Sequence, residues 1–182
     1  MESTQRTLRF RPASIDDFEA CLVIDHRYKT RQVWQLNVTE RHHVKKIRFQ
    51  SVTLPRETAV LYPYEGEALA KRWCASEWFM VGEDNERLQA YITAAMEKLT
   101  PTAWIYDMVV DVKFRRAGYG SHMIDLAANW ARQQNAQQLM AAISTKNDPA
   151  MAFFRKNGFN FCGYNETSYR TKDISLLFSL KL

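Results

Sequence analysis

Residues 115–120, Arg-Arg-Ala-Gly-Tyr-Gly, form a glycine-containing junction between a strand pattern and a helix pattern. The run before it, 104–110, is apolar and rich in β-branched and aromatic residues, which is typical of a largely buried strand. After it, Met123, Ala127 and Ala131 recur at helical spacing. Glycines at such a junction let backbone N–H groups gather around an anion, and the helix N-terminus adds partial positive charge. The junction therefore predicts a diphosphate-binding turn, and a turn that needs glycine only for its backbone geometry is the alternative.

Two better-known phosphate-binding motifs do not fit this junction. No Gly-Lys-Ser/Thr sequence follows the glycines, which excludes a P-loop. A dinucleotide-binding fingerprint is excluded because its third glycine is missing.

A second informative segment, residues 147–159, follows a short apolar strand pattern at 139–143. Asn147 or Asp148 can cap a helix that has Pro149 in its first turn. Gly158 can end that helix in the left-handed conformation. The segment therefore predicts a capped helix after the strand.

The two segments together resemble the GNAT superfamily of N-acetyltransferases. The resemblance rests on Arg115-x-x-Gly118-x-Gly120 and on the pattern N-x-x-A-x-x-F-x-x-x-x-G-F at 147–159, and it covers residues 104–160. It implies an α/β fold with a GNAT-type mixed, partly splayed β-sheet flanked by helices. It also implies acetyl-coenzyme A as cofactor and direct transfer of the acetyl group, in a ternary complex, to a primary amine of a small molecule.

A narrower resemblance is to the streptothricin acetyltransferase-like group, which acetylates an amine on a cationic antibiotic. It rests on residues 25–36, 53–56, 161–165 and 173–176. The alternative is that these are scaffold residues shared by enzymes with various substrates.

The family resemblance implies a set of cofactor-binding residues. Backbone groups of the strand before the junction pair with the pantetheine arm in the family, and those positions match Met108, Val109 and Val110. The junction and the next helices supply the rest of the predicted set, which is Arg115, Arg116, Ala117, Gly118, Tyr119, Gly120, Ser121, Asn147 and Phe154.

Asp107 is the candidate general base, acting directly or through a water molecule. It is an acidic residue inside an otherwise apolar strand, which is costly unless the carboxylate is paired or used in chemistry. A structural carboxylate that accepts hydrogen bonds from a neighbouring loop is the alternative.

The general acid is less evident. Many GNAT enzymes carry a tyrosine where this chain has Phe154, and its hydroxyl can protonate the departing thiolate. Tyr169 is the candidate catalytic hydroxyl here, with Tyr164 as a second choice. We expect that no acid is needed, because a coenzyme A thiolate is a fairly stable leaving group near neutral pH.

Length and composition favour a single N-acetyltransferase domain over residues 1–182. A chain of this length with 46% hydrophobic residues can bury a substantial core. No apolar run is long enough to span a bilayer, and no secretory signal is visible, so we expect a cytoplasmic protein without a membrane partner. Cys21, Cys74 and Cys162 are expected to be reduced core residues.

The net charge of +5 lies in the first third of the chain. Residues 1–56 hold 11 Lys/Arg against 6 Asp/Glu, whereas residues 57–182 hold 14 of each. We interpret the basic run at 41–48 as a solvated strand, so a nucleic-acid partner is not expected. The histidines lack metal-ligand spacing, so no metal is expected. A homodimer stays open.

Three alternative functions also stay open. One is an acyl-coenzyme A-binding regulatory module with weak or no catalysis, and another is a protein or peptide N-acetyltransferase. A structural or nucleic-acid-binding protein is the third. A coarse element order follows from periodicity and turn signals. Helices are expected from 14 and at 25–36, 65–74, 121–135 and 149–157. Strands are expected at 7–12, 44–54, 58–62, 77–82, 88–96, 102–111, 138–144, 159–164 and 173–181.

Overall fold

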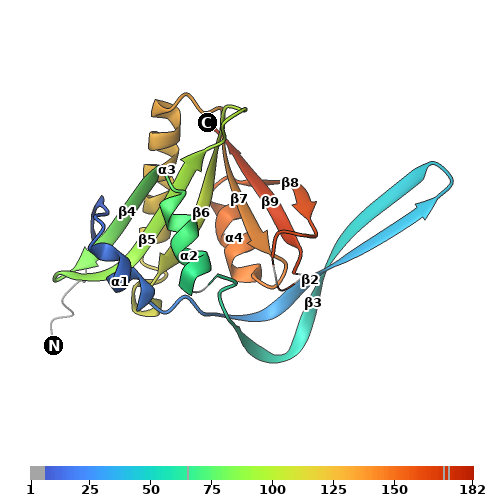
Figure 1. Cartoon of the computed structure of the whole chain (residues 1–182). Coiled ribbons are helices and arrows are strands. Elements are labelled where there is room, and N and C mark those ends of the chain that lie inside the picture. Colours follow the sequence, from blue (N-terminus) through green and yellow to red (C-terminus); the bar gives the residue numbers. More distant parts are fainter. Residues whose placement is uncertain (1–6, 65, 170, 172) are drawn as a thin grey trace. The chain divides into compact units, whose positions relative to one another are not determined.

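Figure 1 presents the computed structural model of the chain, which describes residues 7–64, 66–169, 171 and 173–182. The chain divides into two compact units. The first comprises residues 1–26, 64–141 and 179–182, and the second comprises residues 27–63 and 142–178. The single-domain assignment of the whole chain stays a prediction.

The first unit contains an antiparallel sheet that becomes parallel at its last strand. The order is β1-β4-β5-β6-β7, with all neighbours antiparallel except β6 and β7. The β6–β7 ladder runs from Thr102↔Gln138 to Ile105↔Ala141, and β6 continues beyond it to Val110. The strands are β1 (Arg9–Pro12), β4 (Trp78–Asp84), β5 (Arg87–Met96), β6 (Thr102–Val110) and β7 (Gln138–Ser144).

Helices cover both faces of this sheet (Figure 1). Trp73 of α2 packs against Phe79, whereas Trp130 of α3 stacks on Trp78. Because neighbouring strand residues point to opposite faces, α2 and α3 lie on opposite sides of β4. The helical elements are α1 (Asp17–Leu22), α2 (Gly66–Cys74), the short 3₁₀ helix η1 (Val112–Phe114) and α3 (Tyr119–Gln133).

The second unit contains a long two-stranded ribbon and the C-terminal part of the fold. The ribbon pairs β2 (Tyr28–Arg41) with β3 (Val44–Val60) in antiparallel register. The remaining elements are α4 (Asp148–Lys156), β8 (Asn160–Asn165) and β9 (Ser175–Lys181), whose last residues belong to the first unit. From β7 the strand order continues through β9 to β8, which is the edge strand.

The ribbon corrects two expectations. Residues 25–36 were expected to be helical, but the strand β2 starts at Tyr28. The segment is extended because thirteen residue pairs with β3 satisfy its backbone hydrogen bonds. The strands expected at 44–54 and 58–62 are one strand, β3. Within β3 the register shifts from Thr30↔Thr58 to Gln32↔Thr53, and this bulge accommodates Pro55, which has no N–H group.

The first helix and the cysteines also differ from expectation. A helix from Ser14 is wrong, since α1 starts at Asp17, and Ser14 donates its N–H and hydroxyl to the Asp17 carboxylate instead. Cys21 is fully buried, and burial raises the pKa of its thiol to about 12. Cys74 and Cys162 are exposed, because one ends α2 and the other lies on the edge strand β8.

The main architecture is confirmed. The sheet is mixed and flanked by helices, as predicted. Asn147 caps α4 by accepting a hydrogen bond from the Ala150 N–H at 3.1 Å, and Gly158 follows the helix with φ of +85°. Among the helices that the structure describes, none is both long and apolar enough to cross a membrane.

Candidate functional site

The glycine junction lies between β6 and the 15-residue helix α3. Arg116 and Gly118 both have positive φ, +66° and +91°, so the backbone turns sharply before α3 begins at Tyr119. Residues 116–118 are exposed. The first N–H groups of a helix have no partner within it, and they carry its partial positive charge. The junction therefore offers accessible backbone donors suited to an anion.

Arg115 fixes the junction to the end of β6. Its Nε donates to the Val110 carbonyl at 2.7 Å, and one terminal nitrogen donates to the Asp25 carbonyl at 3.2 Å. The guanidinium thus holds the turn in shape, and the backbone of Arg115 is what remains for the predicted cofactor contact.

Gly118 needs its glycine for backbone conformation. A Cβ atom built on Gly118 meets no heavy atom within 4 Å, so space within this chain does not demand glycine. Its φ of +91° does, because a side chain there is strained. Gly120, in the first turn of α3, has no positive φ, so its glycine has no such backbone reason.

Tyr119 supports the junction from the core side. Its ring lies 6.4 Å, between centroids, from both Phe10 and Phe114. His122 in the same turn contacts Phe10 edge-on and donates its backbone N–H to the Gly118 carbonyl at 3.1 Å. These contacts orient the start of α3.

Asp107 lies in β6 with a fully buried carboxylate. Arg72 of α2 donates its Nε to both carboxylate oxygens, at 3.3 and 3.2 Å. The Thr93 hydroxyl lies 3.5 Å from one of them, and Thr93 Oγ1 also accepts the Asp107 N–H at 3.2 Å. The guanidinium of Arg72 lies over the Tyr64 ring at 3.9 Å. The Asp107 carboxylate therefore has one charged and one neutral partner, and together they hold it in one orientation.

A second polar pair lies on the same face of the sheet. His26 Nε2 and the Tyr91 hydroxyl are 2.8 Å apart, and which one donates depends on the tautomer. Tyr91 is fully buried beside Trp73. Burial raises the pKa of Tyr91 strongly, and the negative charge of Asp107 adds to this, so the hydroxyl is neutral.

The end of β6 carries the three residues predicted to pair with pantetheine. Met108, Val109 and Val110 lie opposite Ile92, Tyr91 and Ala90 of β5. Val109 is buried, whereas Met108 and Val110 are half-buried. All three lie beyond the last β6–β7 pair, so this stretch of β6 is not part of that ladder.

The second unit holds the other predicted residues. Asn147 uses its side-chain oxygen as the α4 cap. Phe154 of α4 is buried and packs edge-on against Phe159 with a centroid distance of 4.9 Å. Tyr169 is buried, and its hydroxyl donates to the Ala142 carbonyl at 3.4 Å.

The predicted residues therefore form two sets. Asp107 to Val110 and Arg115 to Ser121 are close along the chain in the first unit, and Arg115 links them directly. Asn147, Phe154 and Tyr169 belong to the second unit.

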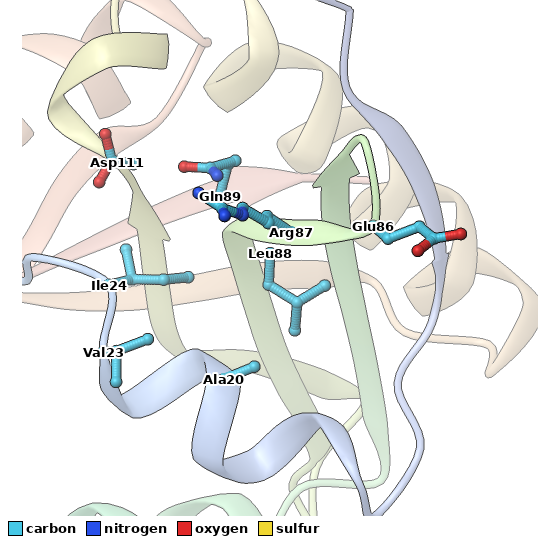
Figure 2. Close-up of a pocket in the computed structure, with 8 residues that line it drawn as sticks. All are labelled: Ala20, Val23, Ile24, Glu86, Arg87, Leu88, Gln89 and Asp111. Carbon is cyan, nitrogen blue, oxygen red and sulfur yellow. The ribbon is translucent and has the colours of Figure 1, made fainter.

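A cavity of about 320 Å³ opens in the first unit beside α1 and the β4–β5 turn (Figure 2). Its apolar part comes from Ala20, Val23, Ile24 and Leu88, and Glu86, Arg87, Gln89 and Asp111 complete it. It contains no predicted site residue. Over the described residues, no group of three or more His, Cys, Asp or Glu side chains could hold a metal ion.

Sequence reasoning missed the partners of Asp107. Thr93 could have been found from the antiparallel β5–β6 register, which places it opposite Asp107. Arg72 could not, because its position depends on how α2 packs on the sheet. The same holds for the His26–Tyr91 pair, whose members are 65 residues apart.

A family model and a curated relative both identify acetyltransferases as similar to this chain. The family model described as the acetyltransferase (GNAT) family matches residues 49–159. The streptothricin acetyltransferase of Streptomyces lavendulae is 25% identical over 170 residues, which cover 90% of this chain and 87% of that protein.

Solved structures share the fold. A nourseothricin acetyltransferase has a TM-score of 0.82 at 19% identity, with 96% of this chain and 98% of its own covered. A Bacillus anthracis protein solved in complex with acetyl coenzyme A has a TM-score of 0.77 at 19% identity, with 97% and 99% covered. At these identities the structural likeness speaks for the fold alone.

Proposed function

The chain belongs to the GNAT acetyltransferase family, and we propose that it transfers the acetyl group of acetyl-coenzyme A to a primary amine of a small molecule, with a streptothricin-type antibiotic as the first candidate. The observation that carries the donor half of this proposal is the glycine junction. It combines positive φ at Arg116 and Gly118 with the N-terminus of a 15-residue helix. Such a cluster of backbone donors suits a diphosphate.

The donor is bound by backbone groups rather than by charged side chains. Residues 115–121 supply N–H donors to the diphosphate, and the Arg115 guanidinium keeps the turn attached to β6. The end of β6, at Met108 to Val110, pairs with the pantetheine arm, as the family resemblance implies. Acetyl-coenzyme A supplies an activated thioester, and one strand N–H stabilises negative charge developing on its carbonyl oxygen.

Asp107 accepts the proton of the attacking amine, directly or through a water molecule. Arg72 and Thr93 hold its carboxylate in one orientation, which is the arrangement that a positioned base needs. The alternative is a structural role, in which the Asp107 carboxylate anchors Arg72 and thereby holds α2 on the sheet. Substitution of Asp107 by asparagine separates these two roles.

No dedicated general acid is needed at the departing sulfur. Phe154 has no proton to give, and Tyr169 donates its hydroxyl proton to a main-chain carbonyl. Solvent protonates the thiolate after it leaves. Holding donor and acceptor together accounts for much of the acceleration, with no covalent enzyme intermediate.

The acceptor is inferred from the relatives. Two of them are named for streptothricin and nourseothricin acetylation, and the match to the first spans most of both chains. The excess positive charge of the chain lies in the β2–β3 ribbon. Residues 28–60 hold seven Lys/Arg and two Asp/Glu, an excess of five that equals the net charge of the whole chain.

The test is a thiol-release screen with acetyl-coenzyme A and three classes of acceptor. These are streptothricin-type antibiotics, simple primary amines and peptides with free N-termini. We expect the highest kcat/KM with a streptothricin-type antibiotic. Turnover confined to peptides would contradict the small-molecule assignment, and coenzyme A binding without any turnover would favour a binding module.

A further inference from the structure

The guanidinium of Arg72 is surrounded by groups that recognise cations. Its Nε donates to both Asp107 carboxylate oxygens, at 3.3 and 3.2 Å, and a terminal nitrogen donates to the Tyr106 carbonyl. The guanidinium carbon lies 3.9 Å from the centroid of the Tyr64 ring and 5.5 Å from that of the Tyr106 ring. A carboxylate combined with aromatic faces suits an ammonium or guanidinium group. We call Tyr64, Tyr106 and Asp107 the cation cluster, and all three belong to the first unit, as Arg72 does.

A β-bulge in β6 brings two consecutive residues into this cluster. Neighbouring residues of a regular strand point to opposite faces of the sheet. Here the register passes from Thr93↔Asp107 to Ala94↔Ile105, which leaves Tyr106 without an opposite residue in β5. A bulge re-aims a side chain, and the Tyr106 ring and the Asp107 carboxylate both contact the same guanidinium. This part of the cation cluster is therefore built into the strand itself.

The helix α2 is attached to the first unit by more than Arg72. The next residue, Trp73, is buried and contacts the rings of Phe18, Phe79 and Tyr91 at centroid distances of 4.6, 5.5 and 5.1 Å. Arg72 lies in the last turn of the helix, where positive charge is favoured, and 26% of its side chain is exposed. Its head group can therefore turn out into water while Trp73 keeps α2 in place.

Charge decides what can take the place of the guanidinium. The Asp107 carboxylate is fully buried, and a buried charge that loses its partner is strongly destabilising. A neutral ligand would leave the carboxylate unpaired, whereas a ligand with a positive charge keeps it paired. A primary amine is such a ligand near neutral pH, because an alkylamine like that of lysine has a pKa of about 10.4 and is protonated.

We propose that the cation cluster is a binding subsite for the acceptor, and that Arg72 fills it until a protonated primary amine displaces the guanidinium. The subsite rests on the proposed acetyl transfer and adds the charged form in which the acceptor enters. The ammonium then lies against the carboxylate that takes its proton, and Thr93 keeps its contact with that carboxylate. Arg72 is thus a competitor of the acceptor, and amines that enter without a positive charge are excluded.

Thermal unfolding with ethylguanidinium tests whether the cation cluster binds a cation from solution. This probe copies the head group of Arg72, and N-ethylurea is its neutral counterpart. In Arg72→Ala, ethylguanidinium at ten times its dissociation constant should raise the Tm by about 3–6 °C, and N-ethylurea should not. Adding Asp107→Asn to this variant should abolish the shift. Calorimetry should give at least tenfold weaker binding of the probe to the wild type, because Arg72 competes.

Lys71→Ala is the matched control for the removal of charge from α2. Lys71 is in the same helical turn and pairs with Glu67 at 2.6 Å, but both side chains are exposed and the pair is not part of the cation cluster. Lys71→Ala should therefore bind ethylguanidinium as weakly as the wild type does. Tighter binding in both variants would trace the effect to net charge and overturn the proposal.

Steady-state kinetics separate a subsite from a structural ion pair, because the two predict opposite effects of the same probe. If the cation cluster holds the acceptor, ethylguanidinium inhibits Arg72→Ala competitively against the acceptor amine, and it inhibits the wild type in the same way at least tenfold less strongly. If Arg72 only orients Asp107, the probe restores activity to Arg72→Ala instead, which would overturn the proposal.

Two further results would also overturn it. One is a Tm of Arg72→Ala that ethylguanidinium leaves unchanged. The other, which needs no variant, is a wild type that ethylguanidinium does not inhibit or inhibits without competing with the acceptor. Binding of ethylguanidinium to Arg72→Ala without turnover of any amine by the wild type would contradict the proposed function and keep the cation cluster as a binding site.

Discussion

Replacement of Gly120 by alanine separates the two explanations of the glycine junction. Gly120 lies in the first turn of α3 and, unlike Gly118, does not have positive φ. Alanine at a compatible position stabilises a protein by about 0.4–1 kcal/mol, mainly by reducing the entropy of the unfolded chain. For a chain of this size that raises the Tm by about 1–4 °C. If glycine serves only the backbone, coenzyme A binding is unchanged.

If the junction holds a diphosphate, the added methyl group intrudes on the ligand. We then expect coenzyme A affinity to fall at least tenfold, which corresponds to about 1.4 kcal/mol, while the Tm rises. Calorimetric titration with coenzyme A and thermal unfolding measure the two effects. Gly163→Ala is the matched control, because its new Cβ would make only an ordinary contact of 3.6 Å with Leu177 Cδ1. Wild-type affinity in Gly120→Ala would refute the diphosphate assignment.

Four further predictions concern single residues. Asp107→Asn should lower kcat by about 10²–10⁴-fold and alter its pH profile if the carboxylate is the base, and an unchanged profile in steady-state kinetics would show a structural role. Tyr169→Phe should change kcat less than tenfold, because no general acid is needed. A loss of several hundredfold in kcat, with intact affinity for acetyl-coenzyme A, would identify Tyr169 as the general acid. The hydrogen bonds with Arg11 lower the pKa of Asp17 to about 2. The ionised carboxylate therefore contributes about 2 kcal/mol to the free energy of unfolding above about pH 4, and this contribution is lost as the pH falls toward 2. Asp17→Asn should flatten that part of the curve of stability against pH, as measured by denaturant titrations. Glu86→Gly should raise the Tm, because Glu86 has φ of +63° in a two-residue hairpin turn where glycine is favoured, and an unchanged Tm would show that no strain is relieved.

The local motifs were predictable, because each depends on residues close in sequence. The Asn147 cap and the Gly158 termination of α4 need only a few neighbours, and the β6–junction–α3 order follows from hydrophobic periodicity. The mixed sheet then follows from the parallel crossover through α3.

What the sequence did not show depends on long-range pairing. Residues 28–36 mix strand formers such as Tyr28, Val33 and Trp34 with Lys, Arg and Gln, and pairing with β3 decides that they form a strand. The Arg72–Asp107 ion pair joins α2 to β6 across 35 residues, so no spacing rule reveals it. Exposure of Cys74 and Cys162 was missed for the same reason, since apolar neighbours in sequence do not determine which face an element buries.

We propose that this chain acetylates a small-molecule amine with acetyl-coenzyme A held at the glycine junction. The most direct measurement is mass spectrometry of streptothricin after incubation with acetyl-coenzyme A and the wild-type protein, with Gly120→Ala beside it at the same donor concentration. We expect antibiotic that carries one added acetyl group in the wild-type reaction, with an equal amount of free coenzyme A, and a much lower yield with Gly120→Ala. Unmodified antibiotic in the presence of wild-type protein that binds acetyl-coenzyme A would contradict it.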